Sequence, residues 1–101
     1  MAEVIWTEPA LEQLDSIAEF IALDKPEAAR AVVRRVIETT QHVERFLKLG
    51  RPVPELPDRR YRQVWIKPCW LYYRLDKDRA YVLHVRRGEK LLRIEDLIGD
   101  E

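Results

Sequence analysis

Residues 59–89 read RRYRQVWIKPCWLYYRLDKDRAYVLHVRRGE, and this stretch decides the fold. Apolar and polar residues alternate along much of it, which is typical of antiparallel strands that bury one face. The alternation predicts strands at residues 61–67, 69–76 and 80–86. A charged turn around Lys77 joins the second strand to the third, so we expect these strands to form a meander.

The alternation also assigns side chains to the faces of the predicted sheet, because successive side chains point to opposite sides. The residues expected on the core side are Arg62, Val64, Ile66, Cys69, Leu71, Tyr73, Leu75, Tyr81, Leu83 and Val85. Those expected on the exposed side are Tyr61, Gln63, Trp65, Lys67, Trp70, Tyr72, Arg74, Ala80, Val82, His84 and Arg86. A bulge in the first strand would reverse part of its assignment. Large rings on an exposed face indicate a binding surface.

A short strand and a first helix are predicted at the start of the chain. A β-rich stretch at residues 4–7 leads into a helix for which Thr7 is the expected N-cap and Pro9 lies in the first turn. The helix is expected to end near Leu23. Its apolar stripe consists of Leu11, Leu14, Ile17, Ala18 and Ile21.

A second helix is predicted to follow almost immediately. Asp24 can cap it, Pro26 suits its first turn, and Glu27 lies three residues on, as in a capping box. An apolar stripe continues to Leu49, where Gly50 suits a C-terminal stop. Two helices joined so tightly are expected to form an antiparallel hairpin.

The remaining segments complete the predicted order of elements. Prolines at positions 52, 54 and 57 indicate an extended connection between the second helix and the meander. Residues 89–98 are expected to form either a short helix or a mobile tail. The prediction is a single α+β domain of order β-α-α-β-β-β, with the helical hairpin on one face of a mainly antiparallel sheet.

Composition restricts the possible functions. The 101 residues carry no formal net charge although 36% of them are charged, so net charge gives no general attraction to nucleic acid. The single cysteine, Cys69, rules out an internal disulfide and a cysteine-based zinc site, and neither a cofactor nor a metal is expected. No segment has the pattern of a signal peptide or a membrane span. We therefore expect a cytoplasmic protein without membrane association.

The order of elements and several short motifs resemble the RelE/ParE superfamily of bacterial toxins. The residues that carry the resemblance are Ile5-Trp6-Thr7, Ala10, Leu14, Pro26-Glu27-Ala28-Ala29, Gly50-Arg51-Pro52, Glu55-Leu56, Tyr61-Arg62, Lys67-Pro68-Cys69, Tyr73-Arg74 and residues 83–89. The resemblance covers nearly the whole chain. It implies the toxin of a type II toxin-antitoxin module, whose cognate antitoxin wraps the toxin with extended and helical segments.

The resemblance implies one of two activities. RelE-like members cut messenger RNA in the ribosome, whereas ParE-like members inhibit DNA gyrase. Trp70 occupies a position where related nucleases carry an arginine that stabilises the phosphate, and an indole has no such charge. The tail beyond Arg87 has neither Tyr nor His. With zero net charge, these features favour the ParE branch and gyrase as the target, and no catalytic residue is assigned.

Two other functions stay open. For a ribosome-dependent messenger RNA endonuclease, the candidate catalytic residues are Lys67, His84, Arg86, Arg87 and Glu89, which could supply a proton acceptor and cations for the phosphate. A degenerate, non-toxic member that retains only antitoxin binding is the third possibility. Direct sequence-specific DNA binding is not expected, because the chain has no DNA-reading motif and the antitoxin would supply its own DNA-binding domain.

The predicted binding surface has two interpretations. In the first, the exposed sheet face receives the antitoxin, with rings and arginines as anchors. The expected partner-binding residues are Trp65, Trp70, Tyr72, Arg74, His84, Arg86 and Arg87. In the second, the rings cover one another, or the C-terminal segment folds back over them and makes them part of a core.

Overall fold

The computed structural model describes residues 2–89 and 92–98 and has the expected α+β architecture. Its elements are β1 (Glu3–Trp6), α1 (Glu8–Ala22), α2 (Pro26–Arg45), β2 (Arg51–Pro52), β3 (Tyr61–Ile66), β4 (Cys69–Asp76), β5 (Arg79–Arg87) and α3 (Glu95–Ile98). The short strand β2, in the proline-rich connection, was not predicted. Of the segment expected to be a short helix or a tail, α3 forms the described end, and residues 90–91 lie outside the described residues.

The strands form one sheet in the order β1-β5-β4-β3-β2. The meander β3-β4-β5 is antiparallel, as predicted. At one edge β1 pairs in parallel with β5, with Ile5 opposite Tyr81. At the other edge β2 pairs antiparallel with β3. The first strand of the chain is therefore held by the last.

The start of α1 confirms Thr7 at the N-cap position, but its side chain does not cap the helix. The Thr7 hydroxyl instead donates to the Val82 carbonyl oxygen at 2.7 Å, which ties the start of α1 to β5. The predicted N-cap of the second helix is wrong by one residue: the Asp24 N–H donates to the Ile21 carbonyl, and Lys25 is the N-cap of α2. Asp24 thus belongs to the turn that follows α1.

The predicted end of the second helix at Leu49 is also wrong, because α2 ends at Arg45. Phe46 leaves the helical region with φ −134°. The following residues bind the sheet: the Leu47 carbonyl accepts a hydrogen bond from the Tyr73 hydroxyl at 2.7 Å, and the Gly50 N–H donates to the same hydroxyl at 2.8 Å. These contacts with β4 replace the final helical turn.

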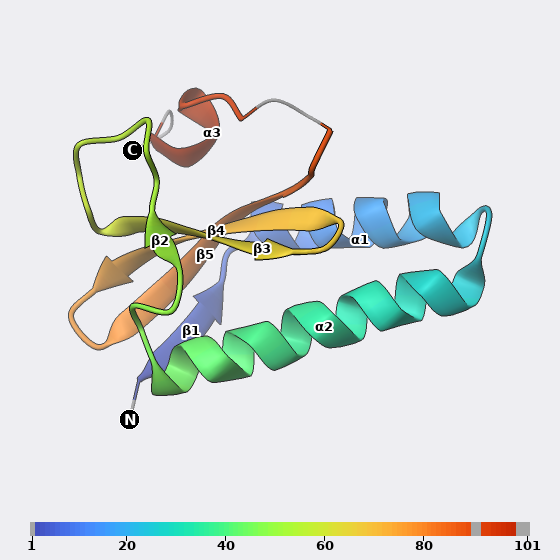
Figure 1. Ribbon diagram of the computed structural model, residues 1–101, viewed down its shortest axis with the longest axis horizontal. Coiled ribbons are helices and arrows are strands. Elements are labelled where there is room, and N and C mark those ends of the chain that lie inside the picture. The colour runs from blue at the N-terminus through green and yellow to red at the C-terminus, as the bar shows by residue number, and fades with distance from the viewer. Residues whose placement is uncertain (1, 90–91, 99–101) are drawn as a thin grey trace.

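The two faces of the sheet are covered by different parts of the chain. The hairpin of α1 and α2 packs on one face, where the core includes Leu14, Val36, Leu71 and Tyr73. In Figure 1, α2 runs below the strands, whereas α3 and the loop after β2 lie above them. We call the face on the α3 side the far face.

A β-bulge corrects the predicted faces of the last strand. Tyr72 pairs with His84 but Tyr73 pairs with Val82, so that Leu83 is an extra residue in β5. Before the bulge, Ala80 and Val82 lie in the core under the helices, not on the exposed side as predicted. Leu83 packs on the far face, and Tyr81 is not part of the helix-side core either. The prediction for Val85 is confirmed, and the face assignments of β3 and β4 hold.

No helix among the described residues is both long and apolar enough to span a membrane.

Candidate partner-binding surface

The far face has a covered half and an open half. In the covered half, Val53, Tyr61, Tyr72 and Leu97 form a second buried cluster. Tyr72 is only 1% exposed, so its predicted exposure is wrong. The reason is that the loop after β2 and the segment carrying α3 both fold over this half of the sheet, as Figure 1 shows. The second interpretation of the rings therefore holds for Tyr72.

The open half centres on Trp65 and Trp70, which stand opposite each other on β3 and β4. Their ring centroids are 5.1 Å apart and the rings are inclined by 53°. Trp65 is 48% exposed, whereas Trp70 is partly buried. A cavity of about 560 Å³ adjoins them and is lined by Leu49, Gly50, Arg51, Gln63, Val64, Trp65, Trp70 and Gly88. We call it the tryptophan pocket.

Gly88 forms part of the wall of the tryptophan pocket. A Cβ atom at this position would lie 2.9 Å from Cη2 of Trp65. The indole of Trp65 therefore packs directly on the backbone of Gly88. A residue with a side chain at this position would displace the indole.

Arg86 is held on the far face by Tyr72. Its Nε donates to the Tyr72 hydroxyl at 2.9 Å, and its guanidinium carbon lies 5.7 Å from the centre of the same ring. Nη1 of Arg86 also approaches the carbonyl oxygens of Arg87 and Gly88, both at 3.4 Å. Burial raises the pKa of Tyr72, and the hydrogen bond from Arg86 partly opposes that rise. Tyr72 thus positions Arg86 from beneath.

Arg87 points to the other side of the sheet. Its guanidinium carbon lies 4.1 Å from the centre of the Phe20 ring on α1, and its Nε lies 3.1 Å from Oε1 of Glu89. The consecutive arginines Arg86 and Arg87 therefore contact different elements. Glu89 neutralises Arg87 and is well exposed.

His84 lies between the sheet and α3. Its side chain is 12% exposed, and Nε2 lies 3.9 Å from Oδ2 of Asp96. Burial lowers the pKa of His84, Asp96 opposes this and Arg86 adds to it, so the imidazole is neutral at pH 7. A cavity of about 390 Å³ at this edge is lined by Glu12, Gln13, Ser16, Ile17, His84, Val85, Arg86, Arg87 and Asp96. It brings together three of the candidate nuclease residues.

Two predicted site residues lie elsewhere. Lys67 is in the turn between β3 and β4, next to the cis peptide bond to Pro68, and is exposed. It does not line the His84 cavity. The guanidinium carbon of Arg74 lies 5.5 Å from the centre of the Tyr81 ring. Among the described residues there is no group of three or more potential metal ligands.

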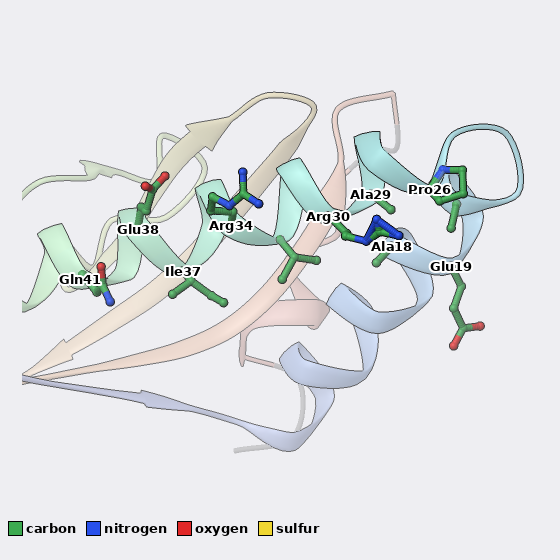
Figure 2. A pocket seen from close by; sticks show the side chains of 11 residues that line it. Ala18, Glu19, Pro26, Ala29, Arg30, Arg34, Ile37, Glu38 and Gln41 are labelled. Atoms are coloured by element: carbon green, nitrogen blue, oxygen red, sulfur yellow. The ribbon is translucent and has the colours of Figure 1, made fainter.

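A groove between the two long helices was not predicted from the sequence. It has a volume of about 730 Å³ and includes Ala18, Ala29, Val33 and Ile37 (Figure 2). Arg34 and Ile37, about one turn apart on α2, line the same groove. The sequence signal that could have revealed the groove is the spacing of the alanines on α1 and α2 together with Ile37. In the structure Ile37 is 48% exposed.

Comparison with known proteins identifies the family. Residues 4–92 match the model described as ParE toxin of type II toxin-antitoxin system, parDE. The chain belongs to the ParE toxin family. Among solved structures, this ParE family member is similar to a chain of the "Chromosomal ParDE TA system from P. aeruginosa", at 26% identity and a TM-score of 0.73. The match covers 88% of this chain and 98% of that chain. No curated protein matches significantly.

The family match confirms the predicted RelE/ParE resemblance and its ParE branch. For this ParE family member, the predicted partner-binding residues fall into separate groups. Trp65 and Trp70 share the open half of the far face, and Tyr72 supports Arg86 from the covered half. Arg87 contacts α1, and Arg74 contacts the Tyr81 ring.

Proposed function

We propose that this ParE family member inhibits DNA gyrase in the cytoplasm and that a cognate antitoxin with its own DNA-binding domain neutralises it. The match to the ParE toxin family over residues 4–92 carries the proposal. The similarity to a chain of a chromosomal ParDE system supports the antitoxin partner.

The environment of Trp70 also supports a target other than RNA. The residue packs against Trp65 and lies at the edge of the buried far-face cluster. An uncharged indole cannot stabilise the additional negative charge of a phosphate transition state. Rings and arginines are common anchors of protein interfaces.

The antitoxin surface that we propose comprises the open half of the far face and its borders. Its anchors are Trp65 and Trp70, with Arg86 held in place by Tyr72. The remaining predicted partner-binding residues lie outside the open half: Arg74 against the Tyr81 ring, His84 beside α3 and Arg87 against Phe20 of α1.

A supercoiling assay tests the gyrase proposal. Purified toxin is added to gyrase, ATP and relaxed plasmid, with and without an equimolar amount of antitoxin. Toxin alone should block supercoiling, and the antitoxin should restore it. A heat-unfolded toxin sample is the control for non-specific inhibition. Full supercoiling at toxin concentrations well above that of gyrase would refute the proposal.

A second candidate function rests on the cavity at His84. A neutral imidazole, Arg86 and Arg87 line one cavity together with the carboxylates of Glu12 and Asp96. Groups of these types could accept the proton of the 2′-hydroxyl of RNA as it attacks the adjacent phosphate, and could supply cations for that phosphate. Primer extension after induction of the toxin would then reveal new 5′ ends at ribosomal A-site codons. Unchanged transcripts during growth arrest would exclude this function.

A third candidate is a non-toxic member that only binds antitoxin. It predicts undiminished colony formation when the chain is expressed alone, although the purified chain still binds the antitoxin.

A further inference from the structure

The turn between α1 and α2 carries apolar side chains that face solvent. Leu23 is 86% exposed and Phe20 is 57% exposed. In Figure 1 this turn projects beyond the strands. A cavity of about 500 Å³ lies at the turn and is lined by Phe20, Ile21, Leu23, Asp24, Lys25 and Ala28, which we call the tip patch. An exposed apolar patch of this kind is typical of a surface that binds another protein.

The exposed face of α1 leads to the tip patch and is acidic. Its carboxylates are spaced by four, three and four residues, which places them along one side of the helix. They belong to Glu8, Glu12, Asp15 and Glu19, which we call the acidic stripe. All are exposed, and α1 contains neither Lys nor Arg. Among the described residues, no ion pair neutralises any of these carboxylates.

The stability of α1 does not explain the acidic stripe. Like charges one turn apart, such as those of Asp15 and Glu19, repel each other on a helix. A carboxylate in the last turn, where Glu19 lies, also interacts unfavourably with the helix dipole. That turn has no basic residue to offset the effect. Sequence features that oppose local stability are characteristic of functional surfaces.

The arginines beside α1 leave the negative charge of the stripe in place. Arg30 and Arg34 line the helical groove together with Glu19, but neither forms an ion pair with it. Arg87 lies against the ring of Phe20 and is paired with Glu89. The outer side of α1 and the tip therefore combine exposed apolar side chains with unneutralised carboxylates.

We propose that the tip patch and the acidic stripe form the surface with which this ParE family member binds DNA gyrase, at a basic part of the gyrase surface. Gyrase acts on DNA and must present basic surfaces to its phosphates. A basic surface is complementary in charge to the acidic stripe, and Leu23 supplies the apolar anchor. None of these residues lines the tryptophan pocket, which we assign to the antitoxin. This inference rests on the proposed gyrase function.

Binding of the full chain to immobilised gyrase, measured by surface plasmon resonance, tests the complementarity of charge. Asp15→Asn combined with Glu19→Gln should weaken binding about two- to tenfold, as the loss of two exposed ion pairs implies. Glu38→Gln combined with Glu44→Gln is the matched control, because it removes two exposed carboxylates from α2 and changes the net charge equally. Equal effects of the two double substitutions would overturn the role of the acidic stripe.

A second pair of variants tests the apolar anchor. Leu23→Ser should weaken binding about tenfold or more, as truncation of an interface anchor does. Phe46→Ser is the control, because Phe46 is also an exposed apolar residue directly after a helix. Circular dichroism verifies that both variants are folded. Unchanged binding in Leu23→Ser, or an equal loss in both variants, would overturn the tip patch as the contact.

The supercoiling assay separates failure of this inference from failure of the gyrase proposal. A parent chain that blocks supercoiling, with variants that block it at the same concentrations, would overturn the surface but leave the gyrase function intact. A parent chain that neither binds nor inhibits gyrase would overturn both proposals. Sedimentation that reveals a dimer broken by Leu23→Ser would assign the tip patch to a second copy of this chain, which also contradicts the inference.

Discussion

The Tyr73 hydroxyl donates to the carbonyl of Leu47 at 2.7 Å, and this bond fixes the end of α2 to the middle of the sheet. The same hydroxyl accepts the Gly50 N–H at 2.8 Å, and the Tyr73 side chain is 1% exposed. One buried side chain thus satisfies two backbone groups of the segment between α2 and β2.

Substitution Tyr73→Phe should lower the free energy of unfolding by about 1–3 kcal/mol, because buried backbone groups lose their partner. Urea denaturation measures this change. Tyr81→Phe is a suitable control, since the Tyr81 hydroxyl makes a long contact of 3.5 Å with Arg79 and the residue is not buried. Equal stability changes in the two variants would contradict the role of the Tyr73 hydroxyl.

The two glycines Gly50 and Gly88 should respond differently to alanine. A Cβ at Gly50 would lie 2.7 Å from the Gln63 carbonyl oxygen, which is backbone within the sheet. Gly50→Ala should therefore destabilise the fold by about 1–3 kcal/mol. At Gly88 the closest atom belongs to the exposed Trp65 ring, which can move. Gly88→Ala should change stability little but shift the Trp65 indole resonance, and the reverse order of stabilities would refute this comparison.

Trp70→Ala should weaken the complex with the antitoxin by about 2 kcal/mol or more, as truncation of a buried aromatic anchor commonly does. Isothermal titration calorimetry with the purified antitoxin measures the difference. The control is Phe46→Ala, which removes an exposed ring just after α2. Unchanged affinity in a folded Trp70→Ala variant would show that the antitoxin uses another surface.

His84 should make the fold sensitive to mild acid. Its folded pKa is lowered mainly by burial, so the unfolded chain binds the proton more readily. The stabilising contribution is complete above the unfolded pKa of about 6.5. It decreases as the pH falls below that value and levels off below the folded pKa. Asp96 and Arg86 are the charged groups that influence His84.

Thermal unfolding between pH 7.5 and 5 tests this dependence. The His84→Gln variant should lose less stability over this range than the parent chain. His42→Gln, an exposed change on α2, should behave like the parent. A steeper acid loss in His84→Gln than in the parent would contradict the sign of the shift.

Periodicity was sufficient to predict much of the sheet but not all of it. In β4, apolar residues alternate with Trp70 and Arg74 clearly enough to fix both faces. The stretch AYVLHV at residues 80–85 is apolar at nearly every position, so its pattern does not reveal the bulge at Leu83. The burial of Tyr72 depends on Val53 and Leu97, which are distant in sequence from it.

The candidate site was predictable only as far as neighbouring strands determine it. The pairing of Trp65 with Trp70 follows from the two-residue turn between β3 and β4. The contact of Arg87 with Phe20 does not, because it depends on how α1 packs beside β5. Likewise, among the described residues β3 has no neighbouring strand beside Trp65, because β2 is only two residues long. The three prolines near β2 do not determine that length.

The parallel pairing of β1 with β5 has a consequence for the timing of folding during synthesis. Glu3–Trp6 is synthesised long before its partner residues 79–82. The sheet can therefore close only after β5 has been made, since this pairing is long-range. A fragment that ends before β5 would therefore lack both the finished sheet and the strand that holds β1.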